Sequence, residues 1–226
     1  MAEVIAVFDL EGTLCQGGQL IWRAFIRICS RQPFGIFRIS TYILSQMVLN
    51  YLGKLGLMGE HRARLHAITG MASLLKGLSQ EDMNHFAATL ADRVMAVLRW
   101  DIVETLKEHK QQGHRVLLVS NLFQPLLEAV GKRLEMDHVV ATGLELDGAR
   151  YTGRVSTPIC LDEQRATMVK EYLEQAGIEV DFAQSFAYGD TKWDRPALEM
   201  VGHPVAVYPD EELRAYAQSQ GWRIIG

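Results

Sequence analysis

The sequence predicts an α/β protein with a parallel sheet and a helical cap inserted after the first strand. Short apolar runs rich in β-branched residues recur along the chain, and helical patterns of about 10–15 residues alternate with them, as in βαβ units. After the first run, about 100 residues pass with apolar positions at helical spacing and no evident strand. Together these two observations predict a parallel-sheet core that is interrupted by a helical insertion.

The strands are expected where continuous apolar runs occur. Residues 3–9 form the first run, which ends at an acid and is typical of a strand buried on both faces. Similar runs predict three further strands, at 114–121, 185–190 and 203–209. The helical patterns that flank them lie at 101–113, 124–135 and 161–177. Asp147-Gly148, between two short segments of residues 138–156, predicts a β-hairpin.

The helical insertion sets the expected domain organisation. Four stretches with helical periodicity predict its helices, at 20–28, 39–53, 64–75 and 83–98. We expect a core formed by residues 1–16 and 96–226 and a cap formed by residues 17–95. The two connections are expected at Gly17-Gly18 and near Trp100.

Composition and charge exclude several classes of protein. With 226 residues, 48% of them hydrophobic, the chain is neither a disordered tail nor a disulfide-stapled miniprotein. A net charge of −4 argues against a nucleic-acid partner. The three cysteines form no CxxC pair, which argues against a zinc site and favours a reducing compartment. The start of the chain lacks the features of a signal peptide, so a cytoplasmic location is expected.

Residues 12–59 depart from this average, because they hold five basic residues and no acid. The bases are Arg23, Arg27, Arg31, Arg38 and Lys54. Two interpretations remain open: a solvated helix-bundle surface, or peripheral contact with the anionic inner face of a membrane. The longest charge-free stretch in this segment, residues 39–53, is shorter than the ~20 residues that a spanning helix needs.

Polar residues close three of the predicted strands, where parallel α/β proteins gather their binding and catalytic groups. The first strand ends in Asp9, followed by Glu11; the second ends in Ser120-Asn121; the third ends in Gly189-Asp190, with Asp194 four residues later. Four carboxylates at one rim repel one another unless a cation lies among them. Mg²⁺ prefers such oxygen ligands and shares them with substrate phosphate, so the sequence predicts a magnesium-dependent phosphate site.

Four segments, in order, resemble the motifs of the haloacid dehalogenase superfamily. They are the run Phe8–Leu14, the strand ending in Ser120, the basic Arg165 and the run Gly189–Asp194. The segment Ala197–Val207 is similar to the phosphoserine-phosphatase-like branch, which carries a helical cap between the first two motifs. The resemblance implies a Rossmann-like α/β core and a phosphatase that works through an aspartyl phosphate.

The resemblance also implies a role for each matching residue. Asp9 would attack phosphorus, while Glu11 would protonate the leaving oxygen and then activate water. Asp9, Asp190 and the backbone carbonyl of Glu11 would hold Mg²⁺. The residues that would bind the phosphoryl group are Ser120, Asn121 and Arg165. The residues that would support the site are Thr13, Gly189 and Asp194.

Two positions depart from the family pattern. Glu11 stands where the family usually has Asp, which keeps acid–base chemistry with one more methylene of reach. Arg165 stands where the family usually has Lys, often after a Cys-x-Gly-x-x run; this chain has Cys160 but Asp162 in place of the glycine. Arginine keeps the positive charge and can bind phosphate through two nitrogens.

The cap is expected to supply the substrate contacts. No acid follows the first motif until Glu60, so nothing there would bind the ammonium group of phosphoserine, and an anionic or amphiphilic ester such as a lysophospholipid phosphate is expected. Two alternatives stay open: a phosphatase of a soluble metabolite such as phosphoserine, and a catalytically weakened phosphate-binding or membrane-peripheral protein. Phosphoryl transfer to an alcohol and the oligomeric state are also left open.

Overall fold

A computed structural model describes residues 2–16, 18–32 and 34–226. Gly17, half of the predicted first connection, lies outside these residues. Six strands form one parallel sheet in the order β3-β2-β1-β6-β7-β8. Their bounds are Ile5–Asp9 (β1), Arg115–Phe123 (β2), His138–Thr142 (β3), Phe186–Gly189 (β6), His203–Val207 (β7) and Arg223–Ile225 (β8). The predicted α/β class with a parallel sheet is confirmed.

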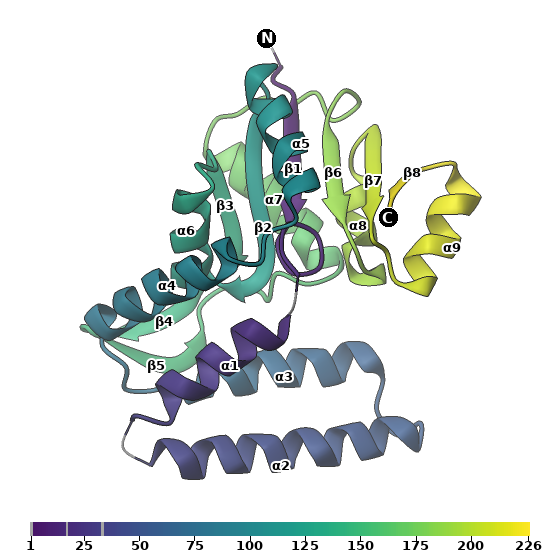
Figure 1. Ribbon diagram of the computed structural model, residues 1–226. Coiled ribbons are helices and arrows are strands. Elements are labelled where there is room, and N and C mark those ends of the chain that lie inside the picture. Colours follow the sequence, from purple (N-terminus) through teal and green to yellow (C-terminus); the bar gives the residue numbers. More distant parts are fainter. Residues whose placement is uncertain (1, 17, 33) are drawn as a thin grey trace.

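Helices cover both faces of this sheet (Figure 1). Two of them, α5 (Trp100–Gln111) and α6 (Gln124–Arg133), pack on one face. Three pack on the other face: α7 (Glu163–Gln175), α8 (Arg195–Glu199) and α9 (Glu211–Gln220). Successive side chains of β1 alternate between the two cores, with Phe8 in the first and Val7 in the second. Because both faces are buried, the strands read as continuous apolar runs.

The predicted hairpin is shorter than expected. It consists of β4 (Leu144–Asp147) and β5 (Arg150–Val155), which pair antiparallel around Gly148 at φ 57°. Residues 138–142 belong instead to β3 of the parallel sheet, because Val140 and Ala141 are buried against β2 and the helices. The three-residue strand β8 has no counterpart among the strands that the sequence predicts, since so short a segment has no recognisable pattern.

Among the described residues, four helices precede α5 in the segment between β1 and β2: α1 (Gly18–Cys29), α2 (Gly35–Lys54), α3 (Glu60–Leu74) and α4 (Gln80–Met95). The first three lie beyond the carboxyl ends of the strands, with α2 farthest from the sheet (Figure 1). Helix α4 contacts both α1 and α6 and so joins these helices to the core. Among the described residues, no helix combines the length and the apolar character needed to cross a membrane.

Candidate active site

The central strand β1 brings the predicted site residues together. Asp9 is its last residue and pairs in register with Val119 of β2, directly before Ser120. On the other side β1 pairs with β6, which ends at Gly189, directly before Asp190. Because the three strands are parallel, their carboxyl ends meet at one edge of the sheet. Helices α1 and α3 lie beyond this edge (Figure 1).

Three carboxylates and one guanidinium group form the centre of the site. Oxygen atoms of Asp9, Asp190 and Asp194 lie within 4.8 Å of one another. Nη1 of Arg165 donates to Oδ1 of Asp9 at 2.9 Å and also to Oδ1 of Asp194. Arg165, Asp9 and Asp194 are buried. One guanidinium group therefore faces three carboxylates in a site largely closed to water.

Burial and mutual repulsion shift the pKa values of this cluster. Burial, followed by repulsion from Asp194, raises the pKa of Asp9, and the same two causes raise the pKa of Asp190 to about 7. At Arg165, burial opposes the charge, but Asp194 and Asp9 outweigh it and raise the pKa of the guanidinium. A divalent cation would relieve the repulsion, and carboxylates are the hard oxygen donors that such an ion binds. The residues present therefore fit a metal ion.

Asp194 fixes the loop that follows β6. Its Oδ2 accepts bonds from the backbone amides of Asp190 (3.1 Å) and Thr191 (2.8 Å) and from the Thr191 hydroxyl (2.9 Å). Gly189 allows this close turn, because a Cβ there would lie 2.5 Å from Cβ of Asp194. With one oxygen occupied by the loop and the other by Arg165, Asp194 positions both.

The loop after β1 carries Glu11, Gly12 and Thr13 past Asp190. The Thr13 hydroxyl donates to Oδ1 of Asp190 at 3.4 Å. A Cβ on Gly12 would lie 1.9 Å from Oδ2 of Asp190, and the φ of +91° also favours glycine. Burial raises the pKa of Glu11, and the positive charge of Arg64 opposes this shift. A raised carboxyl pKa suits a group that donates a proton near neutral pH.

Ser120 and Asn121 lie in an irregular part of β2. The pairing between β2 and β3 changes register between Val119 and Phe123. Ser120 is buried, and its Oγ accepts a bond from the amide of Leu122 at 3.2 Å. Asn121 lines the same cavity as Glu11. Such irregularities re-aim side chains next to active sites.

The segment before Arg165 departs from the family pattern at a strained residue. Asp162 has φ 55° and ψ −134°, a conformation that glycine adopts far more readily than other residues. The resemblance implies that glycine is the usual residue at this position, and glycine would adopt this backbone conformation without strain. The Asp162 side chain instead contacts α3, with Oδ2 3.3 Å from Nδ1 of His61. Asp162 thus connects the loop before α7 to the helices beyond the sheet.

A cavity of about 270 Å³ lies between the strand ends and helices α1 and α3. Glu11 and Asn121 line it from the strand ends, and Trp22 and Arg64 line it from the helices. The guanidinium carbon of Arg64 lies 5.3 Å from the ring centre of Trp193, in the loop after β6. The sequence does not identify Trp22 or Arg64 individually, because a cavity-facing residue on a helix has the same spacing as a neighbour that faces solvent.

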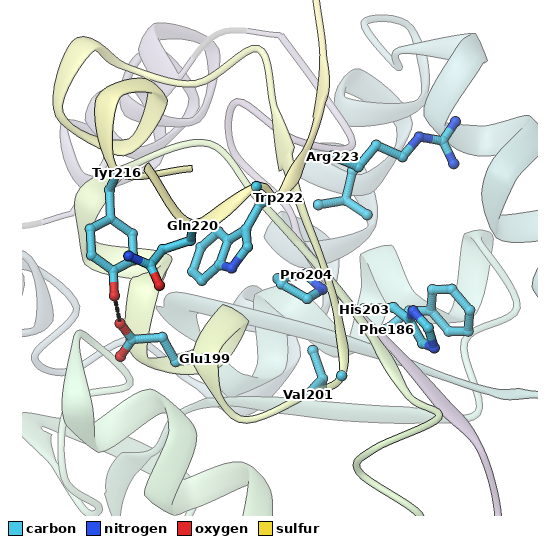
Figure 2. Close-up of a pocket in the computed structure, with 12 residues that line it drawn as sticks. Phe186, Glu199, Val201, His203, Pro204, Tyr216, Gln220, Trp222 and Arg223 are labelled. Atoms are coloured by element: carbon cyan, nitrogen blue, oxygen red, sulfur yellow. Dashed lines mark hydrogen bonds between the residues drawn. The ribbon is translucent and has the colours of Figure 1, made fainter. Parts of the chain in front are cut away.

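A second hollow, of about 640 Å³, lies at the opposite end of the strands. Figure 2 shows Trp222 beside Pro204 of β7, with Tyr216 farther away beyond Gln220, and the Tyr216 hydroxyl donates to Glu199. Its lining includes the amino ends of β6 and β7 together with residues at and after the ends of α8 and α9. It is therefore separate from the carboxylate cluster.

Comparison with known proteins identifies the family. The family model for haloacid dehalogenase-like hydrolases matches residues 6–199, which include every predicted site residue. The chain belongs to the haloacid dehalogenase-like hydrolase family. The matched range contains all four of the segments that resemble the motifs of this family.

Relatives of this haloacid dehalogenase-like chain include several curated proteins. It is 31% identical over 157 residues to an "Inhibition of morphological differentiation protein" of Streptomyces azureus, and the aligned region covers 69% of this chain and 56% of that protein. It is 26% identical over 221 residues to a phosphoserine phosphatase of Mycobacterium tuberculosis, with 97% of this chain and 69% of that protein aligned. It is 32% identical over 124 residues to a histidinol-phosphatase of Neisseria meningitidis (53% and 55%). The chain spans about half the length of the first curated relatives it matches.

Solved structures confirm the haloacid dehalogenase-like fold. A Bordetella pertussis protein of unknown function has a TM-score of 0.80 at 24% identity, with 100% of this chain and 99% of that chain covered. A phospho-aspartyl intermediate analogue of phosphoserine phosphatase has a TM-score of 0.62 at 16% identity (100% and 93%). The expected resemblance to the phosphoserine-phosphatase-like branch is confirmed.

Proposed function

We propose that the chain is a magnesium-dependent phosphatase that hydrolyses a small phosphorylated metabolite through a phosphorylated Asp9. The observation that carries the proposal is the setting of Asp9, a strand-end carboxylate that Arg165 binds within a cluster of oxygen ligands. The family match and the relatives named as phosphatases support the same chemistry.

In the first step, a carboxylate oxygen of Asp9 attacks phosphorus, and a new O–P bond forms as the bond to the leaving alcohol breaks. Glu11 donates its proton to the leaving oxygen, which its raised pKa favours. In the second step, the Glu11 carboxylate takes a proton from water, and the water oxygen attacks phosphorus. The bond to Asp9 then breaks, which releases phosphate and restores both carboxyl groups.

The phosphoryl group needs several positive or donating partners, because phosphoryl transfer depends mainly on positioning and charge stabilisation. We assign Arg165, Ser120 and Asn121 to it. Nε of Arg165 is buried and has no hydrogen-bond partner among the described residues, so a donor remains for a phosphoryl oxygen. Asp9, Asp190 and the backbone carbonyl of Glu11 would hold Mg²⁺, which when bound neutralises charge on the phosphoryl oxygens.

We further propose that residues 17–95 act as a cap over a core of residues 1–16 and 96–226. Polar contacts at the start of α3 support this assignment. Nζ of Lys192, in the loop after β6, binds Glu60 of α3 as well as Glu212. Together with the contact between His61 and Asp162, this interaction holds α3 over the site.

The size of the cavity favours a small substrate. The cavity beside Glu11, with a volume of about 270 Å³, lies near the lower end of ligand pockets, which span ~300–1,000 Å³, and so suits a small ester. The names phosphoserine phosphatase and histidinol-phosphatase among the relatives also point to small metabolites. We therefore favour a soluble metabolite over the amphiphilic lysophospholipid phosphate first expected. Arg64 in the lining would pair with an anionic group of that substrate.

Phosphate release from a panel of phosphomonoesters, with Mg²⁺ present, tests the proposal. The panel contains phosphoserine, histidinol phosphate, sugar phosphates and a short-chain lysophosphatidate. We expect release from at least one small ester and a loss of more than about a thousandfold in Asp9→Asn, whose amide is a poor nucleophile. Phosphate binding without release from any ester would instead support the catalytically weakened protein. Equal rates for wild type and Asp9→Asn would exclude the mechanism.

A further inference from the structure

Helix α2 carries an apolar stripe that no other described residue covers. The stripe consists of Phe37, Leu44, Val48, Tyr51 and Leu55, the last directly after the helix, and each is between 51% and 68% exposed. Spacings of seven, four, three and four residues place these side chains in one sector of the helix. The opposite face packs on α3, where the Tyr42 hydroxyl donates to the carbonyl of Ala67 at 3.3 Å. Isolated exposed apolar residues are common, but a continuous stripe indicates a contact surface.

Two hydroxyl groups beside this stripe, those of Thr41 and Ser45, are already hydrogen-bonded within the helix. Oγ1 of Thr41 donates to the carbonyl of Arg38 at 2.8 Å, and Oγ of Ser45 donates to the carbonyl of Tyr42 at 2.7 Å. Removing water from a hydroxyl costs little when its donor is satisfied, and considerably more when it is not. These two hydroxyls therefore add little to the desolvation cost of placing the outer face of α2 in an apolar layer.

The charges on α2 and on the segments that flank it in the sequence are all of one sign. From residue 31 to residue 59 the chain has three bases and no acid: Arg31 before the helix, Arg38 in its first turn and Lys54 at its end. The guanidinium of Arg38 donates to the carbonyls of Ser73 and Lys76 at the end of α3, whereas Arg31 and Lys54 are exposed. A surface that complements this segment is negatively charged. A symmetric dimer through the stripe would bring bases of one α2 against bases of the other, with no acid on either helix to pair with them. The charge pattern thus favours an anionic surface over a second copy of this chain.

We propose that α2 lies in the headgroup layer of an anionic lipid bilayer, with the stripe toward the acyl chains. Its 20 residues provide a contact about 30 Å long, and the exposed bases Arg31, before the helix, and Lys54, at its end, would meet anionic headgroups. An open groove of about 690 Å³ between α2 and α3, lined by Leu44, Val48 and Leu49, extends the apolar surface. Helices α1 and α3 separate this face from the site (Figure 1), so the contact does not depend on the reaction.

Co-sedimentation of the full chain with vesicles tests the proposal. Vesicles of phosphatidylcholine alone are compared with vesicles that also contain phosphatidylglycerol, each at low and high salt. Wild type is compared with Leu44→Gln/Val48→Gln, which removes the centre of the stripe, and with Lys54→Gln. Leu146→Gln, an exposed apolar position on the β4–β5 hairpin, is the matched control. Circular dichroism checks that all variants fold, and light scattering gives their mass in solution.

We expect wild type to bind the anionic vesicles, with binding that falls as salt rises. The double variant should lose at least about tenfold in partitioning, and Lys54→Gln about fivefold, while Leu146→Gln binds like wild type. The proposal is overturned if wild type binds neither kind of vesicle, or both kinds equally. It is also overturned if the stripe variant only converts a dimer to a monomer, since the stripe would then belong to a second copy.

Discussion

Arg165 binds two carboxylates through one nitrogen, Nη1, and keeps Nε without a partner among the described residues. A lysine at this position has a single ammonium group that would have to serve both purposes. The planar guanidinium can serve the two purposes with different nitrogen atoms: one nitrogen binds Asp9 and Asp194, and the other nitrogens can face the phosphoryl group. The substitution of the usual lysine is thus compatible with phosphate binding.

The acid–base role of Glu11 is tested by Glu11→Gln. We expect kcat to fall by roughly 10²–10⁴, because the amide can neither protonate the leaving oxygen nor activate water. Metal affinity should change little, since the proposed ligand is the backbone carbonyl. Glu11→Asp, which restores the usual family residue, is the control and should remain active. Steady-state kinetics with Mg²⁺ titration measures both quantities, and an unchanged kcat in Glu11→Gln would show that Glu11 has no chemical role.

The strain at Asp162 predicts a stabilising substitution. Asp162→Gly should raise the free energy of unfolding by about 1 kcal/mol, because the relieved strain of about 1–3 kcal/mol exceeds the entropic cost of glycine. Asp162→Asn removes the charge next to His61 but keeps the side chain, so it controls for that contact. Urea denaturation measures the free energy of unfolding of wild type, Asp162→Gly and Asp162→Asn. If Asp162→Gly were less stable than wild type, the inference that the backbone at Asp162 is strained would be wrong.

At the scale of helices and strands, burial of the sheet on both faces decides which strands can be predicted from the sequence. Strands β1, β2, β6 and β7 are predictable as continuous apolar runs, and β3 is mistaken for part of the hairpin because only Gly143 separates it from β4. The strand-end residues of the site are predictable for the same reason, since parallel topology fixes where Asp9 and Asp190 meet. Trp22 and Arg64 are not predictable, because their place depends on how α1 and α3 pack over the sheet.

Helix α5 is joined to the sheet by a buried histidine. Nε2 of His109 lies 2.7 Å from the Tyr188 hydroxyl on β6, and Nδ1 lies 2.8 Å from Nδ1 of His114. Burial, and then the neighbouring His114, lower the pKa of His109 to about 4. An unfolded chain binds this proton near pH 6.5, so between pH 6.5 and about 4 the unfolded state holds more protons than the folded one. Protein stability should therefore fall as the pH is lowered through this range.

Comparing wild type with His109→Gln isolates this effect from the opposite contribution of Asp190, whose raised pKa favours folding at low pH. We expect wild type to lose about 1–2 kcal/mol more than the variant between pH 7 and pH 4.5. Chemical denaturation at a series of pH values measures the difference. Parallel stability curves for the two proteins would show that His109 does not titrate in this way.

Across the whole molecule, charge is unevenly distributed. Residues 12–59 hold five bases and no acid, whereas the rest of the chain has nine more acids than bases. The carboxylate cluster lies in the acidic part, where a divalent cation is attracted before any substrate arrives. Metal binding and folding should therefore be linked.

Mg²⁺ should raise the thermal midpoint of unfolding, because the ion binds the folded carboxylate cluster and relieves its repulsion. At a concentration 100 times its Kd, the gain would be about 2.7 kcal/mol. Asp190→Asn should lose most of this gain, whereas a chelator should return wild type to its metal-free midpoint. Differential scanning calorimetry with and without Mg²⁺ measures the shift. A midpoint that does not respond to Mg²⁺ would exclude the cluster as a metal site.

The most direct test of the central claim is to trap the phosphorylated enzyme. Wild type turning over an active phosphomonoester from the panel, or a generic aryl phosphate, is quenched in acid, digested and searched by mass spectrometry for a phosphorylated peptide. We predict an acid-stable, base-labile phosphate on Asp9 in wild type, more of it in Glu11→Gln if hydrolysis of the intermediate is slowed most, and none in Asp9→Asn. Phosphate release without any phosphorylated Asp9, or with the phosphate on another residue, would contradict the account.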